Sequence, residues 1–219
     1  MSAIADFIAA RLPPVAPPGA PELLLHLAHP GSGLRRFLEA NDPRPDPPAP
    51  YWAYAWGGGT ALARHVLDHP ELVAGRRVLD LGAGSGLVGI AAARAGAAEV
   101  FAAEIAPHGR AAIALNAALN GVGLRLIVED LLQPQAALPA VDLVLVGDLF
   151  YAPELAAGAT AFLDRCLAAG LEAMVGDPYR AALPRSRLRL VSEYPCTDFG
   201  GRAGGRAAAA GVFAFLSAP

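Results

Sequence analysis

Lysine is absent from this 219-residue chain, and charged residues of either sign make up only 17% of it. All 17 basic residues are arginine, which we attribute to a coding bias toward GC-rich codons and not to function. The formal net charge of −3 provides no overall positive field that could gather nucleic acid or an anionic membrane. The composition therefore predicts a protein that binds neither.

Cysteine and long apolar runs are also scarce. Two isolated cysteines, Cys166 and Cys196, suit a reducing compartment better than a disulfide framework, and they argue against a zinc site. No segment has the uninterrupted apolar length of a membrane helix. The N-terminus carries the early acid Asp6 and no basic region, so it does not resemble a signal peptide. We expect a cytoplasmic protein that holds no metal.

Apolar residues make up 54% of the chain, and its length suits one α/β domain preceded by a lead segment. Much of the proline lies before residue 51, and residues 41–50 form a proline-rich connector. We therefore expect a lead segment of short helices over residues 1–50 and a folded domain over residues 51–219.

From residue 60 onward, apolar runs alternate with helical patterns. The expected helices are 60–69, 86–95, 107–120 and 153–169, and the expected strands are 77–81, 99–103, 124–128, 141–147 and 171–175. This alternation predicts an α/β fold with a parallel sheet and helices on both faces. Two further strands, 187–194 and 212–216, are separated only by the Gly- and Ala-rich loop 200–211. At least one strand should therefore run antiparallel at the sheet edge.

The stretch Val78–Ile90 predicts a buried strand, a tight turn and the start of a helix. Gly82, Gly84 and Gly86 let the backbone bend sharply and let a ligand approach bare peptide groups, while the helix behind them offers unpaired N–H groups. The overlapping pattern G-x-G-x-x-G also occurs in dinucleotide-binding proteins. Asp80 favours another ligand, because a carboxylate repels a pyrophosphate but suits the ammonium and sulfonium groups of S-adenosylmethionine.

Acidic residues follow the other expected strands, where open α/β sheets bind their ligands. Glu104 ends the second strand, at about the distance from the glycine turn at which an acid reaches the ribose hydroxyls of a nucleoside. The alternative is a solvated acid at the strand end. Asp130 follows the third strand and either joins the same site or opens a turn. Asp148 ends the fourth strand, where a carboxylate can hold a nucleophilic amine.

Two groups of aromatic residues accompany these acids. Phe150 and Tyr151 follow Asp148 and can line a channel for the amine; the alternative is that both rings pack under the next helix while Asp148 caps a turn. Trp52 and Trp56 belong to an aromatic run at the start of the domain. Such clusters are more often core than site, but aromatic faces can hold a sulfonium and an adenine.

Other chemistries do not fit the sequence. Ser85 lacks the flanking glycines of the G-x-S-x-G nucleophile elbow. His65 and His69 lack the glutamate of the zinc-protease motif and a third ligand. Asn116 and Asn120 lie one helical turn apart on one face, and we interpret them as capping or packing residues.

These motifs resemble those of the seven-strand class I methyltransferases. The segments that carry this likeness are Asp80–Gly86, Glu104 and Asp148–Tyr151. Residues 50–56, residues 147–151 and the tripeptide Gly176-Asp177-Pro178 are further similar to one branch, the protein lysine methyltransferases that act on the electron transfer flavoprotein β-subunit. The likeness runs from about residue 50 to residue 216.

The resemblance implies a sheet in the order 3-2-1-4-5-7-6 with the last strand antiparallel. It also implies S-adenosylmethionine as the cofactor and S-adenosylhomocysteine as its product. The implied cofactor-binding residues are Trp52, Trp56, Asp80, Gly82, Gly84 and Gly86, with Glu104 on the ribose and Asp130 near the adenine. Asp148 and Tyr151 are expected to be catalytic, and Phe150 to bind the substrate with them.

The expected function is that of a monomeric protein-lysine N-methyltransferase whose protein partner is the electron transfer flavoprotein β-subunit. Three alternatives stay open. The acceptor could be a nucleobase or small-molecule amine, because the Asp-x-Phe-Tyr motif resembles the Asn/Asp-Pro-Pro-Tyr motif of amino-methylating enzymes. The overlapping glycine pattern allows a nicotinamide-dependent oxidoreductase. The last alternative is a cofactor-binding module without catalysis.

Overall fold

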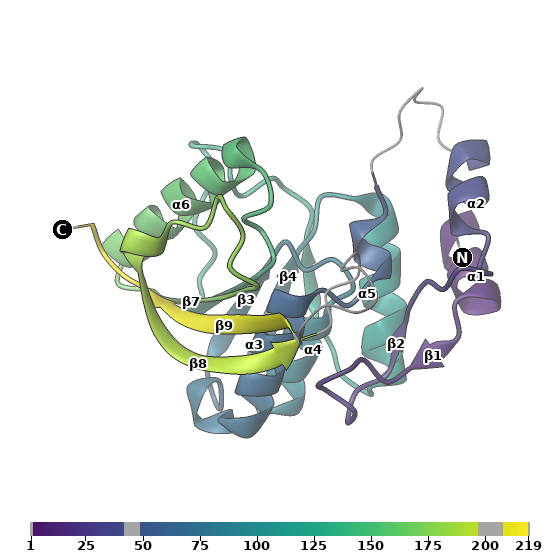
Figure 1. Ribbon diagram of the computed structural model, residues 1–219, viewed down its shortest axis with the longest axis horizontal. Helices are drawn as coiled ribbons and strands as arrows, with labels where there is room; N and C mark the ends of the chain where they lie inside the picture. The colour runs from purple at the N-terminus through teal and green to yellow at the C-terminus, as the bar shows by residue number, and fades with distance from the viewer. Residues whose placement is uncertain (1, 42–48, 197–207, 219) are drawn as a thin grey trace.

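The computed structural model describes residues 2–41, 49–196 and 208–218, and its centre is a seven-stranded sheet with helices on both faces (Figure 1). The strands stand in the order β5-β4-β3-β6-β7-β9-β8, which is the predicted order 3-2-1-4-5-7-6. Strand β9 runs antiparallel to both of its neighbours, and the other neighbouring pairs of this sheet are parallel. The expected α/β fold and its antiparallel edge are confirmed.

Most strands begin and end close to their predicted bounds. They are β3 (Arg77–Leu81), β4 (Glu99–Ala103), β5 (Arg125–Ile127), β6 (Leu143–Gly147), β7 (Glu172–Asp177), β8 (Leu188–Cys196) and β9 (Ala208–Phe215). Strand β9 starts earlier than predicted, because pairing with the end of β8 overrides the low strand propensity of its alanines. Most of the expected loop 200–211 lies outside the described residues.

The core helices also follow the prediction, with one correction. They are α3 (Gly57–Asp68), α4 (Leu87–Arg94), α5 (Pro107–Leu119) and α6 (Pro153–Ala168). Helix α3 does not begin at the predicted residue 60. It starts at Gly57, and the Thr60 hydroxyl donates to the Trp56 carbonyl within the first turn. Across the described residues, no helix combines the length and the apolar character that crossing a membrane requires.

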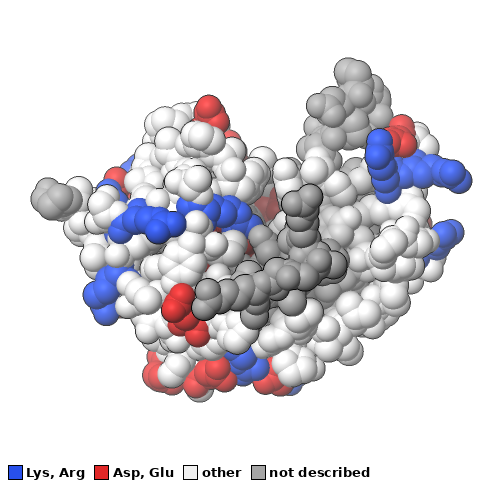
Figure 2. Space-filling view, viewed as in Figure 1, with Lys and Arg blue, Asp and Glu red and all other residues white. Residues whose placement is uncertain are grey.

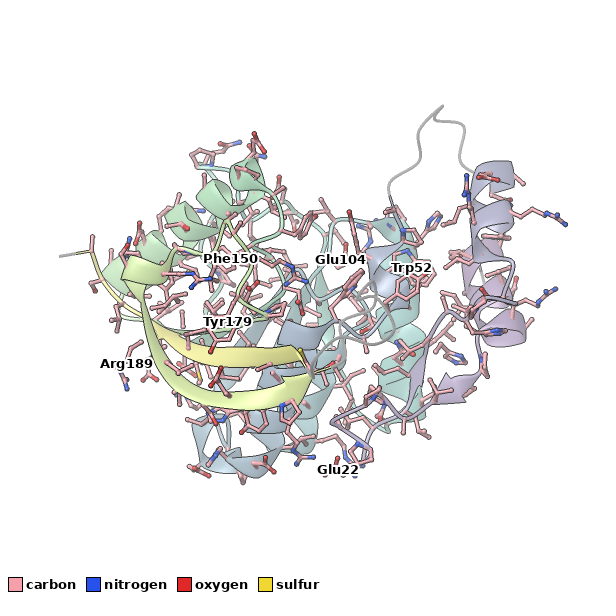
Figure 3. All side chains as sticks on the ribbon, viewed as in Figure 1. Glu22, Trp52, Glu104, Phe150, Tyr179 and Arg189 are labelled. Atoms are coloured by element: carbon pink, nitrogen blue, oxygen red, sulfur yellow. The ribbon has the colours of Figure 1, made fainter. Side chains whose placement is uncertain are left out.

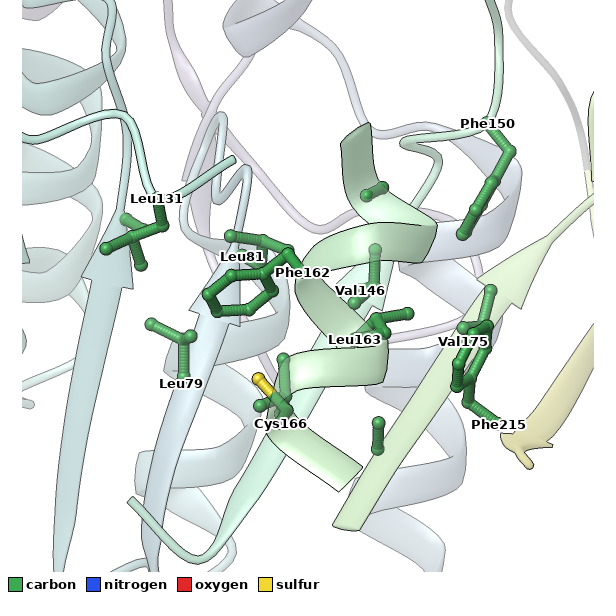
Figure 4. Close-up of a cluster of buried hydrophobic side chains, with 14 of the residues drawn as sticks. Leu79, Leu81, Leu131, Val146, Phe150, Phe162, Leu163, Cys166, Val175 and Phe215 are labelled. Atoms are coloured by element: carbon green, nitrogen blue, oxygen red, sulfur yellow. The ribbon is translucent and has the colours of Figure 1, made fainter. Parts of the chain in front are cut away.

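Alternating strand residues supply two hydrophobic layers, one on each face of the sheet. Helix α6 covers the first face, where Phe162 and Leu163 belong to the same buried cluster as Leu79 and Val146 (Figure 4). Helices α3 and α4 cover the opposite face and bury the neighbouring strand positions, such as Val78. Burying each large aliphatic or aromatic side chain stabilises the fold by about 1.5–3 kcal/mol.

Glycines allow helix α3 to lie directly on the backbone of the sheet. A β-carbon at Gly58 would overlap the carbonyl of Gly176 in β7, and one at Gly147 in β6 would lie 2.8 Å from the Cα atom of Gly59. Because these side chains are missing, the first turn of α3 approaches the ends of β6 and β7 more closely than other residues permit.

The lead segment packs beside α5 (Figure 1). It consists of α1 (Ala3–Arg11), the paired short strands β1 (Pro14–Val15) and β2 (Leu25–His26), and α2 (Leu34–Asn41). Ile8 and Leu12 share a buried cluster with Trp52 and with Ala112 of α5. The expected short helices are thus present, while residues 42–48 of the proline-rich connector lie outside the described residues. The domain boundary at residue 50 stays a prediction.

Two asparagines of α5 hold this segment through its backbone. Asn120 accepts from the Leu24 N–H at 3.0 Å and donates to the Leu24 carbonyl at 2.7 Å. Asn116 accepts from the His26 N–H and donates to the Ser85 carbonyl, both at 2.8 Å. These contacts agree with the interpretation of both residues as packing residues. They also join the lead segment to the glycine turn.

We expect Gly58→Ala to destabilise the protein by about 1–3 kcal/mol, because the new methyl group would overlap the Gly176 carbonyl and push α3 off the sheet. Gly123→Ala is the matched control: no atom lies within 4 Å of its added β-carbon. Urea unfolding at neutral pH measures both free energies of unfolding. Equal stabilities for the two variants would contradict the close contact between α3 and β7.

Candidate active site

A cavity of about 1080 Å³ opens at the carboxyl edge of the sheet, between the ends of β3, β4 and β6 and the aromatic segment before α3. The space-filling view shows the molecule hollowed between the part that carries α6 and the N-terminal helices (Figure 2). Trp52 and Glu104 both line the cavity and lie next to each other in the view with side chains (Figure 3). The acidic and basic side chains of the described lining are Asp80, Glu104, His108, Glu129, Asp130, Asp148 and Arg180. The charged part of the lining is therefore mainly acidic.

Residues from the first turns of α3, α4 and α5 contribute to the cavity wall. Within the described chain, the N-cap residues of these helices, Trp56, Gly86 and Ala106, make no side-chain capping bond. Helix N-termini carry backbone N–H groups without intrahelical partners and a partial positive charge. The hydrogen-bond acceptors for these N–H groups must therefore come from other parts of the chain.

Carboxylates from the ends of β3 and β4 supply two of these acceptors. Asp80, which is 2% exposed, accepts from the Gly89 N–H of α4 at 2.8 Å. Glu104 accepts from the Ala106 N–H at the start of α5 at 2.7 Å, and from the Gly84 N–H of the glycine turn at 2.9 Å. The two carboxylates therefore fix the glycine turn between the helices, with both acids at the cavity wall.

Asp148 caps the third helix from the end of β6. Its Oδ1 atom accepts from the Gly58 N–H at 3.1 Å, and its Oδ2 atom accepts from the Gly59 N–H. The backbone of Asp148 lies in the left-handed region, with φ 59°, which aspartate and asparagine tolerate better than most residues. This conformation turns the side chain away from the strand and onto the N-terminus of α3, at the cavity wall.

The sequence interpretation missed Arg180, although it singled out the neighbouring tripeptide. The Nη1 atom of Arg180 lies 2.5 Å from Asp148 Oδ1 and 3.1 Å from Asp177 Oδ2. Asp177 is fully buried and also accepts from the backbone N–H of Arg180 at 2.7 Å. The available signal was the pair of acids at the ends of adjacent strands, because buried carboxylates require a cationic partner.

The structure fixes the remaining predicted cofactor-binding residues in different ways. Asp130 lines the cavity and accepts from the Leu132 N–H, so it opens a turn as the alternative interpretation had it. Gly82, Gly84 and Gly86 all have positive φ angles, from 55° to 82°, and the turn therefore requires them. A β-carbon at Gly82 would also lie 2.5 Å from a methyl group of Leu149.

The aromatic residues divide between cavity and core. Trp52, Trp56 and Tyr151 line the cavity, and the ring of Tyr151 lies 5.1 Å from that of Tyr51. Phe150 does not line the cavity: its side chain is fully buried in the cluster beneath α6, as the alternative interpretation had it (Figure 4). Burial in the core removes the large apolar surface of the Phe150 ring from water.

Burial also changes how the acids titrate. It raises the pKa of Asp80 to about 7, and Glu104 adds to this rise, while the Gly89 N–H opposes it. Burial raises the pKa of Asp148 as well, with Arg180 and the N–H groups of Gly59 and Gly58 offsetting part of the effect.

These contacts allow a test of which cofactor fits. The Gly84 and Gly89 N–H groups, which a pyrophosphate would need, are already bonded to Glu104 and Asp80. An anionic dinucleotide would have to displace a carboxylate and then lie beside it. A cofactor with a sulfonium, an ammonium and a ribose fits the acidic, aromatic lining.

Comparisons with known proteins show the family of this chain. Residues 56–147 match the family of ribosomal protein L11 methyltransferases (PrmA). The electron transfer flavoprotein beta subunit lysine methyltransferase of Xenopus laevis is 38% identical over 199 residues, which cover 88% of this chain and 79% of that protein. The chain belongs to the electron transfer flavoprotein β-subunit lysine methyltransferase family. The family member of Rattus norvegicus is 40% identical over 133 residues, covering 60% of this chain.

The chain aligns with only part of some family members, spanning 51% of the Rattus norvegicus protein and 64% of the Danio rerio protein. Among solved structures, the ribosomal protein L11 methylase of Lactobacillus delbrueckii subsp. bulgaricus has a TM-score of 0.51 at 25% identity, over 72% of this chain and 77% of that one. The Synechocystis PCC 6803 magnesium protoporphyrin IX methyltransferase, solved with bound SAH, has a TM-score of 0.54 at 16% identity, over 85% and 95% of the two chains. This last likeness shows the fold alone.

The titration of Asp80 predicts a pH-dependent stability. An acid whose pKa is higher in the folded state stabilises the fold below its unfolded pKa of about 3.8, and this contribution is lost as the pH rises to about 7. From pH 5 to pH 7.5, the wild-type protein should therefore lose on the order of 2 kcal/mol more stability than Asp80→Asn, which cannot ionise. Urea unfolding of both proteins at the two pH values measures the difference. Parallel losses would show that Asp80 does not hold a proton in the folded state.

Proposed function

We propose that this protein transfers methyl groups from S-adenosylmethionine to lysine side chains of a protein, the electron transfer flavoprotein β-subunit. The observation that carries the proposal is the position of Asp148 in a member of this methyltransferase family. Its carboxylate lies at the wall of an acidic and aromatic cavity, held by the N-terminus of α3. Such a carboxylate can accept an N–H group from an amine that enters the cavity.

The engaged backbone amides support the cofactor assignment. Since Asp80 and Glu104 bond the N–H groups that an anion would need, the site disfavours nicotinamide dinucleotides. Two backbone bonds leave part of the Glu104 carboxylate free to accept ribose hydroxyls, because a carboxylate offers about four acceptor positions. We assign Asp130 to the adenine end, and Trp52 and Trp56 to the aromatic wall beside the cofactor.

The acceptor side follows from the chemistry of amines. S-adenosylmethionine, when bound, supplies a methyl group on a sulfonium, and only an amine with a lone pair can attack it. Deprotonating a lysine of pKa ~10.4 at neutral pH costs roughly 4–5 kcal/mol. A cavity that removes the amine from water lowers this cost, and Asp148 orients the amine through its remaining N–H.

Tyr151 suits a hydrogen-bonding role better than that of a base. Its ring is about half exposed at the cavity. Burial of its hydroxyl, with Tyr51 and Glu104 nearby, raises the pKa of Tyr151 above that of free tyrosine, so the phenol keeps its proton at neutral pH. Positioning by Asp148 and Tyr151 is the main contribution of the protein. The monomeric state and the cytoplasmic location stay predictions.

The cofactor assignment predicts that Glu104→Gln weakens S-adenosylhomocysteine binding about ten- to a hundredfold, since charge-assisted bonds of this kind contribute roughly 1.5–3 kcal/mol. Glu99→Gln is the matched control, because Glu99 begins the same strand and pairs with Arg125. Isothermal titration calorimetry measures both affinities, and NAD serves as the competing ligand. NAD binding in place of S-adenosylhomocysteine would contradict the assignment.

The acceptor assignment predicts that Asp148→Asn slows methylation of the electron transfer flavoprotein β-subunit by about ten- to a hundredfold. Asparagine keeps the shape and tolerates the left-handed backbone, but it loses the charge that orients the amine. Its affinity for S-adenosylhomocysteine should change little. Asp142→Asn, at the other end of the same strand region and paired with Arg77, is the control.

Transfer of labelled methyl groups from S-adenosylmethionine, followed by mass spectrometry, measures the rate and identifies the acceptor. A wild-type rate in Asp148→Asn would reject the role of Asp148. Label in a nucleic-acid or metabolite fraction, with the protein substrate unlabelled, would replace the proposed acceptor with a nucleobase or a small-molecule amine.

A further inference from the structure

Arg180 links Asp148, at the cavity wall, to the buried carboxylate of Asp177. Its Nη1 atom bridges Asp148 and Asp177, at 2.5 Å and 3.1 Å, and all three side chains are largely or fully buried. Arg180 belongs to the turn after β7, in which Tyr179 has the positive φ of 65°. The backbone N–H of Arg180 is bonded to Asp177 as well. The backbone of Arg180 is thus fixed to Asp177, while its guanidinium extends to Asp148.

The charges of this group do not balance. Two carboxylates share one guanidinium, so the three side chains together carry a net charge of −1. Of the roughly four acceptor positions of the Asp148 carboxylate, Gly58, Gly59 and Arg180 take three. A second cation at Asp148 would neutralise the remaining charge, and Arg180 could then keep its bond to Asp177.

We propose that Arg180 is a specificity-determining residue that occupies, before the substrate binds, the position on Asp148 that a substrate ammonium takes. This inference rests on the proposed lysine methyltransferase function. The incoming ammonium displaces the guanidinium from Asp148, and Asp177 retains Arg180 at the edge of the site. A neutral hydroxyl or carbonyl group cannot displace the guanidinium, because the buried Asp148 carboxylate would then lose its positively charged partner. The site therefore admits cationic amines and rejects other nucleophiles of similar size.

Two variants should change substrate affinity in opposite directions. Asp177→Asn removes the charge that retains Arg180, so the guanidinium stays on Asp148; the KM for the electron transfer flavoprotein β-subunit should rise about tenfold. The double variant Asp177→Asn/Arg180→Met removes the retaining charge and the competing guanidinium together. Its KM should return to the wild-type value or fall below it. Asp164→Asn, which disrupts the Arg187 pair outside the cavity, should leave KM unchanged.

A purely structural role for Arg180 predicts the opposite order of KM values. The KM of the double variant would then be at least as high as that of Asp177→Asn. Thermal melting and S-adenosylhomocysteine titration of each variant show whether the fold and the cofactor site are intact. If both are intact and the double variant still has the higher KM, the proposal is wrong.

A binding measurement separates this proposal from the proposed function. We would titrate protein labelled with ¹⁵N-arginine with n-butylammonium chloride and follow the Nε–H resonance of Arg180 by NMR. The resonance should shift in the wild-type protein and stay unchanged in Asp148→Asn. A shift in a protein that methylates no lysine would reject the methyltransferase function but keep the displacement. An unmoved resonance in a protein that methylates lysine would reject the displacement alone.

Discussion

Three helices at the carboxyl edge of the sheet begin without a capping side chain of their own, and carboxylates from the strand ends bond their N–H groups instead. Asp80 serves α4, Glu104 serves α5 and Asp148 serves α3. Each bond joins a strand to a helix across the sheet edge and satisfies groups that burial would leave unpaired. The same bonds bring three acids to one cavity. The requirement for helix capping and the acidic character of the site thus have one physical origin.

This arrangement depends on glycines that let backbones touch. Helix α3 reaches Asp148 only because Gly58 and Gly59 lie against the backbone at the ends of β7 and β6. The arrangement also leaves carboxylates partly or fully buried, and burial raises the pKa values of Asp80, Glu104, Asp148 and Asp177. Buried charge is costly unless it is paired. These buried carboxylates therefore lower the stability of the fold at neutral pH. They also create a negative field that suits a cationic cofactor and an amine.

The sequence predicted the features that depend on local patterns. Apolar runs located β3 and β4, and the resemblance to a methyltransferase family implied the strand order that the structure has. The start of α3 could not be predicted in this way, because its first three residues are glycines, which have a low helix propensity. Only the close packing against the sheet explains why the helix begins there. The local pattern left open whether Phe150 lines a channel or packs under the next helix, and the folded structure shows that it is buried. Arg180 escaped notice because its contact with Asp148 joins residues 32 positions apart in the sequence, which no local pattern reveals.

The central claim is that Asp148 receives the substrate amine beside a cofactor held at Glu104. A crystal structure of the protein with S-adenosylhomocysteine and a lysine peptide from the electron transfer flavoprotein β-subunit tests it most directly. The account predicts the lysine nitrogen within about 3 Å of a carboxylate oxygen of Asp148, and the ribose hydroxyls at the same distance from Glu104. A lysine nitrogen bound elsewhere in the cavity, with Asp148 still bonded only to Arg180 and α3, would contradict it.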